Sequence, residues 1–247
     1  FAQDETGWAN LCRLVSRAHL DRPAHLDPHV PIADLDGYSE GLIALTGAGE
    51  GALTRLLAEG QANHAEAVLA RLEGLFPGRL YIELARRKDP VEEAAEEALI
   101  DLAYAHDLPL VASNPAQYAD PHFHAAHDAM LCIAASTHLD AEDRVRSSPE
   151  AFVKSSEMMA EIFEDLPEAL ANTVVVAQRC AFAPPKRAPI LPSLAGDLEG
   201  EARMLAEDAR AGLAARLALY DDLTAEQRLE YEERLDFEID IIVGMGF

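Results

Sequence analysis

Three histidines in a short polar stretch are the residues best suited to chemistry in this sequence. His122, His124 and His127 follow an apolar run, residues 108–112, that ends in the turn-forming residues Ser-Asn-Pro. We interpret the run as a buried strand, which would place the polar residues after it at a functional edge of a sheet. Imidazole nitrogens bind transition metals, but a metal site also needs ligands that converge in space. A metal site and a set of solvent-facing or backbone-bonded histidines both remain open.

The spacing of the three histidines predicts different locations for them. His124 and His127 are three residues apart and would share a face if a helix begins early, whereas His122 is expected in the loop. We predict no catalytic nucleophile and no cofactor-binding residue. Cys132 stands in an apolar run that disfavours a thiolate, and the acidic residues of 226–238 are spaced as a solvated helix face.

The charge of the chain limits its direct partners. The 247 residues include 20 Lys and Arg against 44 Asp and Glu, a formal net charge of −24. A surface of this sign repels a phosphate backbone, so any DNA contact is expected elsewhere or at small basic groups such as Arg86, Arg87 and Lys88. The 3 cysteines are far apart and form no disulfide or thiolate-zinc pattern, which favours a cytoplasmic protein. No membrane segment or signal peptide is predicted.

Strand and helix patterns alternate in the first half of the chain. Strands are expected at 41–46, 80–84 and 108–112, and helices at 6–20, 52–57, 65–75 and after the Asp89 N-cap with Pro90 at the first helical position. This alternation predicts a parallel sheet or barrel. Gly47 and Gly49 suit a tight strand-to-helix connection better than an anion cradle.

Helices are expected from Asp140 onward. Asp165 with Glu168 resembles a capping box, and residues 183–192, with four prolines, read as a linker. Beyond the linker, a helix is expected at 201–220, and another from a Thr224–Gln227 start to about Val243, before Gly244.

A family resemblance runs along the whole chain. The stretches TGWANLCRLVSRA, LPLVASN, AHDAMLCI, DAEDR, SSPEAFVKSSEMM, DLPEALANTVVVAQRC and ERLDFEIDIIVGMGF resemble, in order, the polymerase-and-histidinol-phosphatase (PHP) domain of the bacterial DNA polymerase III alpha subunit and the segment after it. The resemblance implies a fold of the α/β class. Residues 1–190 would be the later part of a distorted (βα)7 barrel, and residues 191–247 the all-helical start of the polymerase core, leading into the palm. Because the sequence begins with Phe1 and ends at Phe247 directly after a helical pattern, we expect a partial chain.

The resemblance also implies where metal ligands would lie. The family pattern expects a ligand, often His, shortly after the LYIEL strand, and an Asp-Ala-His triplet before AHDAMLCI. Arg87 stands at the first position and Ala125 replaces the Asp, while His127 matches the triplet's His. A guanidinium and a methyl group cannot coordinate a metal. The resemblance therefore predicts a degraded metal site in which His127, or His124 beside it, is the remaining candidate ligand.

The function implied by the resemblance is that of a longer protein. Such a subunit adds deoxynucleotides to a primer in chromosomal replication, using Mg²⁺ held by carboxylates outside this segment. Its PHP domain would bind the proofreading exonuclease subunit, and other regions would contact DNA and the sliding clamp. The alternatives are a stand-alone metal-dependent PHP phosphoesterase, a PHP-derived scaffold without chemistry, and a specialised error-prone relative of the same polymerase.

Overall fold

The chain folds into two compact units. The computed structural model describes residues 1–188 and 192–246, and the units comprise residues 1–185 and 186–247. The boundary predicted at residue 190 lies outside the described residues. None of the helices in the described part of the chain is long and apolar enough to cross a membrane.

A parallel sheet forms the centre of the first unit. Strands β1 (Ala44–Leu45), β2 (Leu80–Ala85) and β3 (Leu110–Ser113) pair in the order β1-β2-β3, with Ala44 opposite Leu80 and Ile82 opposite Leu110. All three predicted strands are therefore confirmed, β1 as a shorter one. Because the strands are parallel, their carboxyl ends lie at one edge of the sheet.

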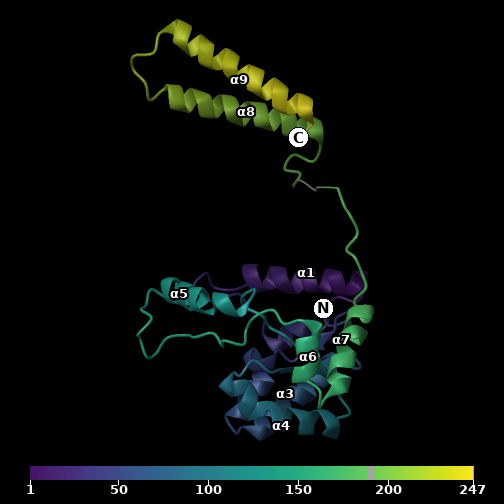
Figure 1. Ribbon diagram of the computed structural model, residues 1–247. Coiled ribbons are helices and arrows are strands. Elements are labelled where there is room, and N and C mark those ends of the chain that lie inside the picture. Colours follow the sequence, from purple (N-terminus) through teal and green to yellow (C-terminus); the bar gives the residue numbers. More distant parts are fainter. Residues whose placement is uncertain (189–191, 247) are drawn as a thin grey trace. The chain divides into compact units, whose positions relative to one another are not determined.

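Helices connect and cover these strands (Figure 1). Those of the first unit are α1 (Glu5–Leu20), α2 (Ala52–Ala58), α3 (Ala62–Leu75), α4 (Pro90–Ala105), α5 (His124–Ala134), α6 (Ser156–Ile162) and α7 (Pro167–Arg179), with short 3₁₀ helices η1 (Ile32–Leu35), η2 (Ala48–Glu50) and η3 (Pro121–Phe123). Helix α2 packs on α4, and α7 packs against β3. The mixed α/β architecture is thus confirmed. Within residues 1–188 and 192–246 the sheet has three strands and remains open, so the predicted barrel is not confirmed.

The core follows from the alternation of side chains along β2. Leu80, Ile82 and Leu84 point to one face, into a large cluster with Leu53 and Leu69 of the helices. Tyr81 points to the other face, into a smaller cluster that includes Ile43, Val111 and Val176. Burial of both faces is typical of a parallel sheet.

The second unit is a helical hairpin. Helices α8 (Leu198–Leu217) and α9 (Ala225–Met245) pack side by side, with Leu217 and Ile239 buried between them (Figure 1). Helix α9 begins with the predicted capping box of Thr224 and Gln227. Its predicted end before Gly244 is wrong, because the helix continues to Met245. Gly246, with φ of 75°, supplies the left-handed residue that ends it.

Two other local predictions are wrong. Asp165 does not cap α7, whose N-cap is Leu166, because the Asp165 carboxylate accepts hydrogen bonds from Arg86 instead. Helix does not begin near Asp140 either. Residues 140–154 contain no helix, and part of this segment is bonded to the strand ends described below.

Candidate functional site at the carboxyl ends of the strands

Three segments meet at the carboxyl ends of β2 and β3. They are residues 86–88 after β2, residues 114–115 after β3, and a loop at residues 147–154. The Ser148 hydroxyl donates to the carbonyl of Arg87, and the Asn114 amide donates to the carbonyl of Phe152 at 3.2 Å. The 147–154 loop is therefore fastened to both strand ends.

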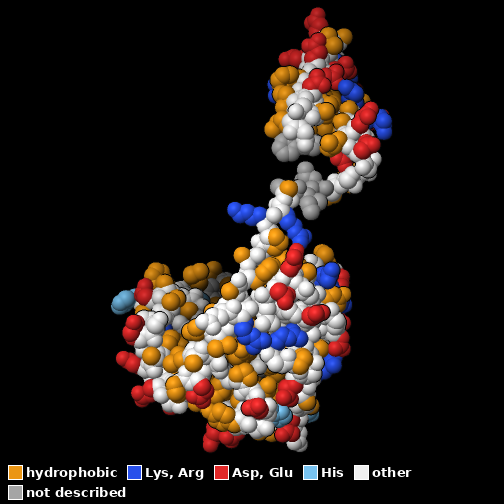
Figure 2. All heavy atoms as spheres, turned by 90° about the vertical axis from the view of Figure 1, so that its right-hand side faces the viewer, with side chains coloured by type: hydrophobic (Ala, Val, Ile, Leu, Met, Phe, Trp, Pro, Cys, Tyr) orange, Lys and Arg blue, Asp and Glu red, His pale blue; other side chains and the backbone are white. Residues whose placement is uncertain are grey.

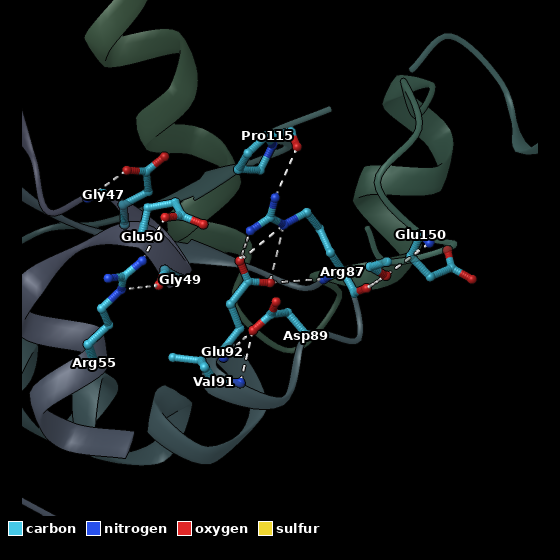
Figure 3. Close-up of polar contacts among 12 residues, drawn as sticks. Gly47, Gly49, Glu50, Arg55, Arg87, Asp89, Val91, Glu92, Pro115 and Glu150 are labelled. Carbon is cyan, nitrogen blue, oxygen red and sulfur yellow. Dashed lines mark hydrogen bonds and ion pairs between the residues drawn. The ribbon is translucent and has the colours of Figure 1, made fainter. Parts of the chain in front are cut away.

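A buried ion pair lies where β2 ends. Arg87 is 8% exposed and Glu92 is 4% exposed, and Nε of Arg87 is 3.1 Å from Oε1 of Glu92. On its other side, Nη1 of Arg87 donates to the carbonyl of Pro115 at 3.2 Å. Figure 3 shows the guanidinium between the carboxylate and this carbonyl. Arg87 is therefore buried and paired, which leaves it poorly placed for the DNA contact that the sequence allowed at this small basic group.

The start of α4 brings Glu92 back to Arg87. The Asp89 side chain accepts hydrogen bonds from the backbone N–H groups of Val91 and Glu92, and Pro90 occupies the first helical position, as predicted (Figure 3). A carboxylate in the first turn of a helix is also favoured by the helix dipole. Gly49 leaves room for it, since a Cβ there would lie 2.9 Å from Oε1 of Glu92.

The neighbouring Arg86 joins different elements. Its guanidinium pairs with Glu96 of α4 at 2.7 Å and with Asp165 at 2.6 Å, and lies 4.7 Å from the ring centroid of Phe163. The hydrogen bonds from Arg86 hold the pKa of the Asp165 carboxyl below its ordinary value. Arg86 thus connects the end of β2 to α4 and to the junction of α6 and α7.

A cavity of about 540 Å³ opens beside this edge of the sheet. It is lined by residues of the β2–α4 turn, of α4, of α6, and by Glu150 and Lys154. Lys154 packs its ammonium 4.2 Å from the ring centroid of Phe152, and burial lowers the pKa of this lysine. Four cationic side chains line the cavity, and each is paired with a carboxylate of the described residues: Arg86, Arg87, Lys88 and Lys154.

Acidic side chains are spread over the face of the chain in Figure 2, and Lys and Arg occur there in a few small groups. At the end of β2, the charges of Arg86, Arg87 and Lys88 are balanced by the carboxylates with which they form ion pairs. An anionic ligand would have to compete with those carboxylates for them.

The histidines predicted as metal ligands meet at one serine. Nε2 of His124 donates to the carbonyl of Ser147 at 3.1 Å, and Nδ1 of His127 lies 3.0 Å from the Ser147 hydroxyl. The ring of Tyr118 packs against both imidazoles, with centroid distances of 5.8 and 5.4 Å. His122 lies in η3 and is exposed. The early start of α5 thus brings His124 and His127 together and leaves His122 apart.

Residues around the histidines hold both the 147–154 loop and the segment just before it. The hydroxyl of Tyr118 donates to the carbonyl of Ser148 at 2.6 Å, and burial raises the pKa of this tyrosine. Asp128 of α5 receives hydrogen bonds from Arg144 at 2.5 and 2.7 Å, which hold the pKa of the Asp128 carboxyl below its ordinary value.

The described residues contain no group of three or more His, Cys, Asp or Glu side chains placed to hold a metal ion. The assignment of His127, or His124, as a metal ligand stays a prediction.

Sequence reasoning missed the partners that organise this region. Ser147, Ser148 and Glu92 carry most of its contacts, yet none has a residue type that signals such a role alone. Glu92 could have been inferred from its place in the first turn after Asp89-Pro90, which directs an acidic side chain back toward the preceding strand end.

Sequence comparisons show which known proteins the chain resembles. Residues 1–87 match the PHP domain family. The whole chain aligns with the DNA polymerase III subunit alpha of Caulobacter vibrioides at 45% identity, of Rickettsia bellii at 35% and of Escherichia coli strain K12 at 36%. The alignments cover 100% of this chain and 21%, 22% and 22% of those relatives, so the chain spans about a fifth of their length. The chain is thus similar over its full length to one segment of these DNA polymerase III alpha subunits, and its first 87 residues match the PHP domain family.

Proposed function

We propose that this chain serves within a DNA polymerase III alpha subunit, which adds deoxynucleotides to a primer during chromosomal replication. Residues 1–190 would form a structural platform, as part of a distorted (βα)7 barrel in the longer protein, and would bind the proofreading exonuclease subunit. Residues 191–247 would form the helical start of the polymerase core. The Mg²⁺ of polymerisation, most contacts to DNA and those to the sliding clamp would lie in other regions, and the whole would work in the cytoplasm.

The Arg87–Glu92 ion pair is the observation that carries the platform role. The position at which the family pattern expects a metal ligand holds a guanidinium, which repels metal ions and has no lone pair to offer. Its charge is balanced by Glu92, and its hydrogen bonds connect β2, α4 and the residue after β3. The guanidinium therefore does not fit a metal at this position. The side chain holds the strand ends together instead.

The charge of the chain supports the proposal that other regions of the longer protein make most of the contacts to DNA. Phosphate backbones are bound mainly by unpaired Lys and Arg. The cations beside the cavity are paired, and the chain carries a net charge of −24. The paired cations and the negative net charge favour binding of protein partners over binding of DNA.

Metal analysis of an intact alpha subunit that contains this segment tests the proposal. We expect well below one zinc, manganese or iron ion per chain after purification without chelators. A doubly substituted subunit, Arg87→His with Ala125→Asp, restores two ligand types and serves as the comparison. Stoichiometric metal in the native subunit, or hydrolysis of p-nitrophenyl phosphate that depends on His127, would favour a phosphoesterase instead.

Binding of the exonuclease is tested separately. The purified subunit is mixed with the proofreading exonuclease, and the complex is followed by size-exclusion chromatography. We expect a stable complex that survives Arg210→Ala in the hairpin but weakens with Arg87→Met, which disturbs the strand ends. Absence of a complex with the native subunit would contradict the platform role.

A further inference from the structure

One buried hydroxyl in the first unit has no visible partner. Thr54, in the first turn of α2, is 1% exposed, and its Oγ1 forms no hydrogen bond with any residue that the structure describes. Threonine in a helix often donates to the carbonyl four residues earlier, which here would be that of Glu50. No such bond is made. A buried hydroxyl without a partner is unfavourable, so a partner is expected nearby.

Thr54 lines a small cavity. The cavity lies between η2, α2, β2 and α4, and about 10 Å³ of it is open to the centre of a water molecule. That is roughly the least volume that holds one water. Its lining residues are Ala48, Thr54, Glu83, Leu84, Ala85, Glu92, Glu96 and Leu99.

The cavity offers acceptors as well as the orphan hydroxyl. Glu92 lines it, and the Glu92 carboxylate can accept further hydrogen bonds beyond those from Arg87. The carboxylate also lies against Gly49 of η2, where a Cβ would come within 2.9 Å of Oε1. Ordered buried waters occur where a small cavity provides two or more polar partners, and the lining of this cavity includes two such residues, Thr54 and Glu92.

We propose that this cavity binds one ordered water molecule, which joins the hydroxyl of Thr54 to the carboxylate of Glu92. Thr54 is then a positioning residue. It positions the Glu92 carboxylate through the water, while Arg87 donates hydrogen bonds to the same carboxylate directly. This bridge lies in the interior of the first unit and does not depend on what the longer protein does.

The water can be observed directly in the full 247-residue chain. In a uniformly labelled sample, we expect cross-relaxation between the Thr54 methyl group and a water of long residence time, seen as water–protein NOE and ROE peaks of the slow-tumbling sign. The peaks should persist in Thr54→Ser, detected at the methyl group of Ala48 in the cavity lining, and vanish in Thr54→Val. No long-lived water at this position in the native chain would overturn the proposal.

The sign of a stability change provides a second test. If the water is present, Thr54→Val removes a satisfied hydrogen-bonded group, and the unfolding equilibrium constant should rise roughly three- to tenfold. If the cavity is dry, the same change removes an unsatisfied hydroxyl and should leave stability unchanged or increase it, which would contradict the proposal. The matched control is Thr173→Val in α7, whose hydroxyl donates to the carbonyl of Leu170 at 2.7 Å.

A background without the carboxylate tests the link to Glu92. In an Arg87→Leu/Glu92→Leu chain, the water loses its charged acceptor, so we expect Thr54→Val to change the unfolding equilibrium constant by less than in the native chain. An equal change in both backgrounds would show that the hydroxyl acts without Glu92 and would refute the proposed bridge.

Discussion

Arg87 and His127, which the sequence predicts to stand where the PHP family pattern has metal ligands, have different surroundings. Arg87 is buried and faces a buried carboxylate, whereas His127 is half-buried and faces the neutral hydroxyl of Ser147. Both are connected to the same loop, at Ser148 and Ser147.

The two positions differ in the group that remains in the interior when the Arg87 or His127 side chain is removed. Loss of Arg87 leaves a carboxylate charge in the interior, which is costly. Loss of His127 leaves a hydroxyl, which costs much less. We therefore expect the end of β2 to depend on its charged pair far more than α5 depends on its imidazole.

The largest effect is expected at the ion pair. Arg87→Met should lower the free energy of unfolding by about 3–5 kcal/mol, because Glu92 then remains buried without its counter-charge. Urea denaturation followed by circular dichroism measures the change. The double variant Arg87→Met/Glu92→Met should recover much of the loss. If the single variant stays within about 0.5 kcal/mol of the native chain, the typical size of a surface substitution, the pair has no structural role.

The next effect is expected at the glycine beside Glu92. Gly49→Ala places a Cβ 2.9 Å from the Glu92 carboxylate, and we expect a loss of roughly 1–3 kcal/mol from this overpacking. Gly74→Ala in α3 is the control, since nothing lies within 4 Å of a Cβ there. That change should stabilise the chain by about 0.5–1 kcal/mol. Equal effects at both positions, in thermal unfolding, would mean that Glu92 does not occupy the space beside Gly49.

A smaller effect is expected at the histidine. His127→Leu removes the contact with the Ser147 hydroxyl and should cost about 0.5–1.5 kcal/mol in urea denaturation. His122→Leu, at an exposed position, should change stability by no more than about 0.5 kcal/mol. A loss at His127 as large as that at Arg87 would remove the contrast between the two positions.

The smallest effect is a pH dependence near the histidines. Arg144 lowers the pKa of Asp128 in the folded chain below its unfolded value of about 3.9. The stabilisation is thus fully present above that unfolded value and is lost as the pH falls through the folded pKa. We expect Asp128→Asn to be less stable than the native chain at pH 7, with the difference shrinking below about pH 4. A difference that is constant from pH 7 to pH 2.5 would show that this carboxylate has no lowered pKa.

Much of the fold could be predicted from local sequence patterns. Apolar runs gave the positions of all three strands, and Asp89-Pro90 and Thr224–Gln227 marked two helix starts, because capping depends on a few adjacent residues. The capping prediction at Asp165 was wrong because a residue 79 positions away, Arg86, takes its carboxylate. Local patterns carry no information on such contacts.

The candidate site was predictable only in outline. The sequence identified the ends of the strands, whereas the assignment of Arg87 and His127 to ligand positions stays a prediction. It did not indicate that Arg87 is buried with Glu92, or that Ser147 and Ser148 join both positions, because these contacts depend on the path of the 147–154 loop. Serine and glutamate are common surface residues, so their types alone gave no signal.

A crystal structure of the chain soaked in manganese or zinc chloride, with anomalous diffraction data, would test the central claim most directly. The account predicts that Arg87 remains hydrogen-bonded to Glu92 and to the carbonyl of Pro115, with no anomalous peak within bonding distance of His124 or His127. An ion bound by those histidines, with the Arg87 guanidinium turned away from Glu92, would contradict it.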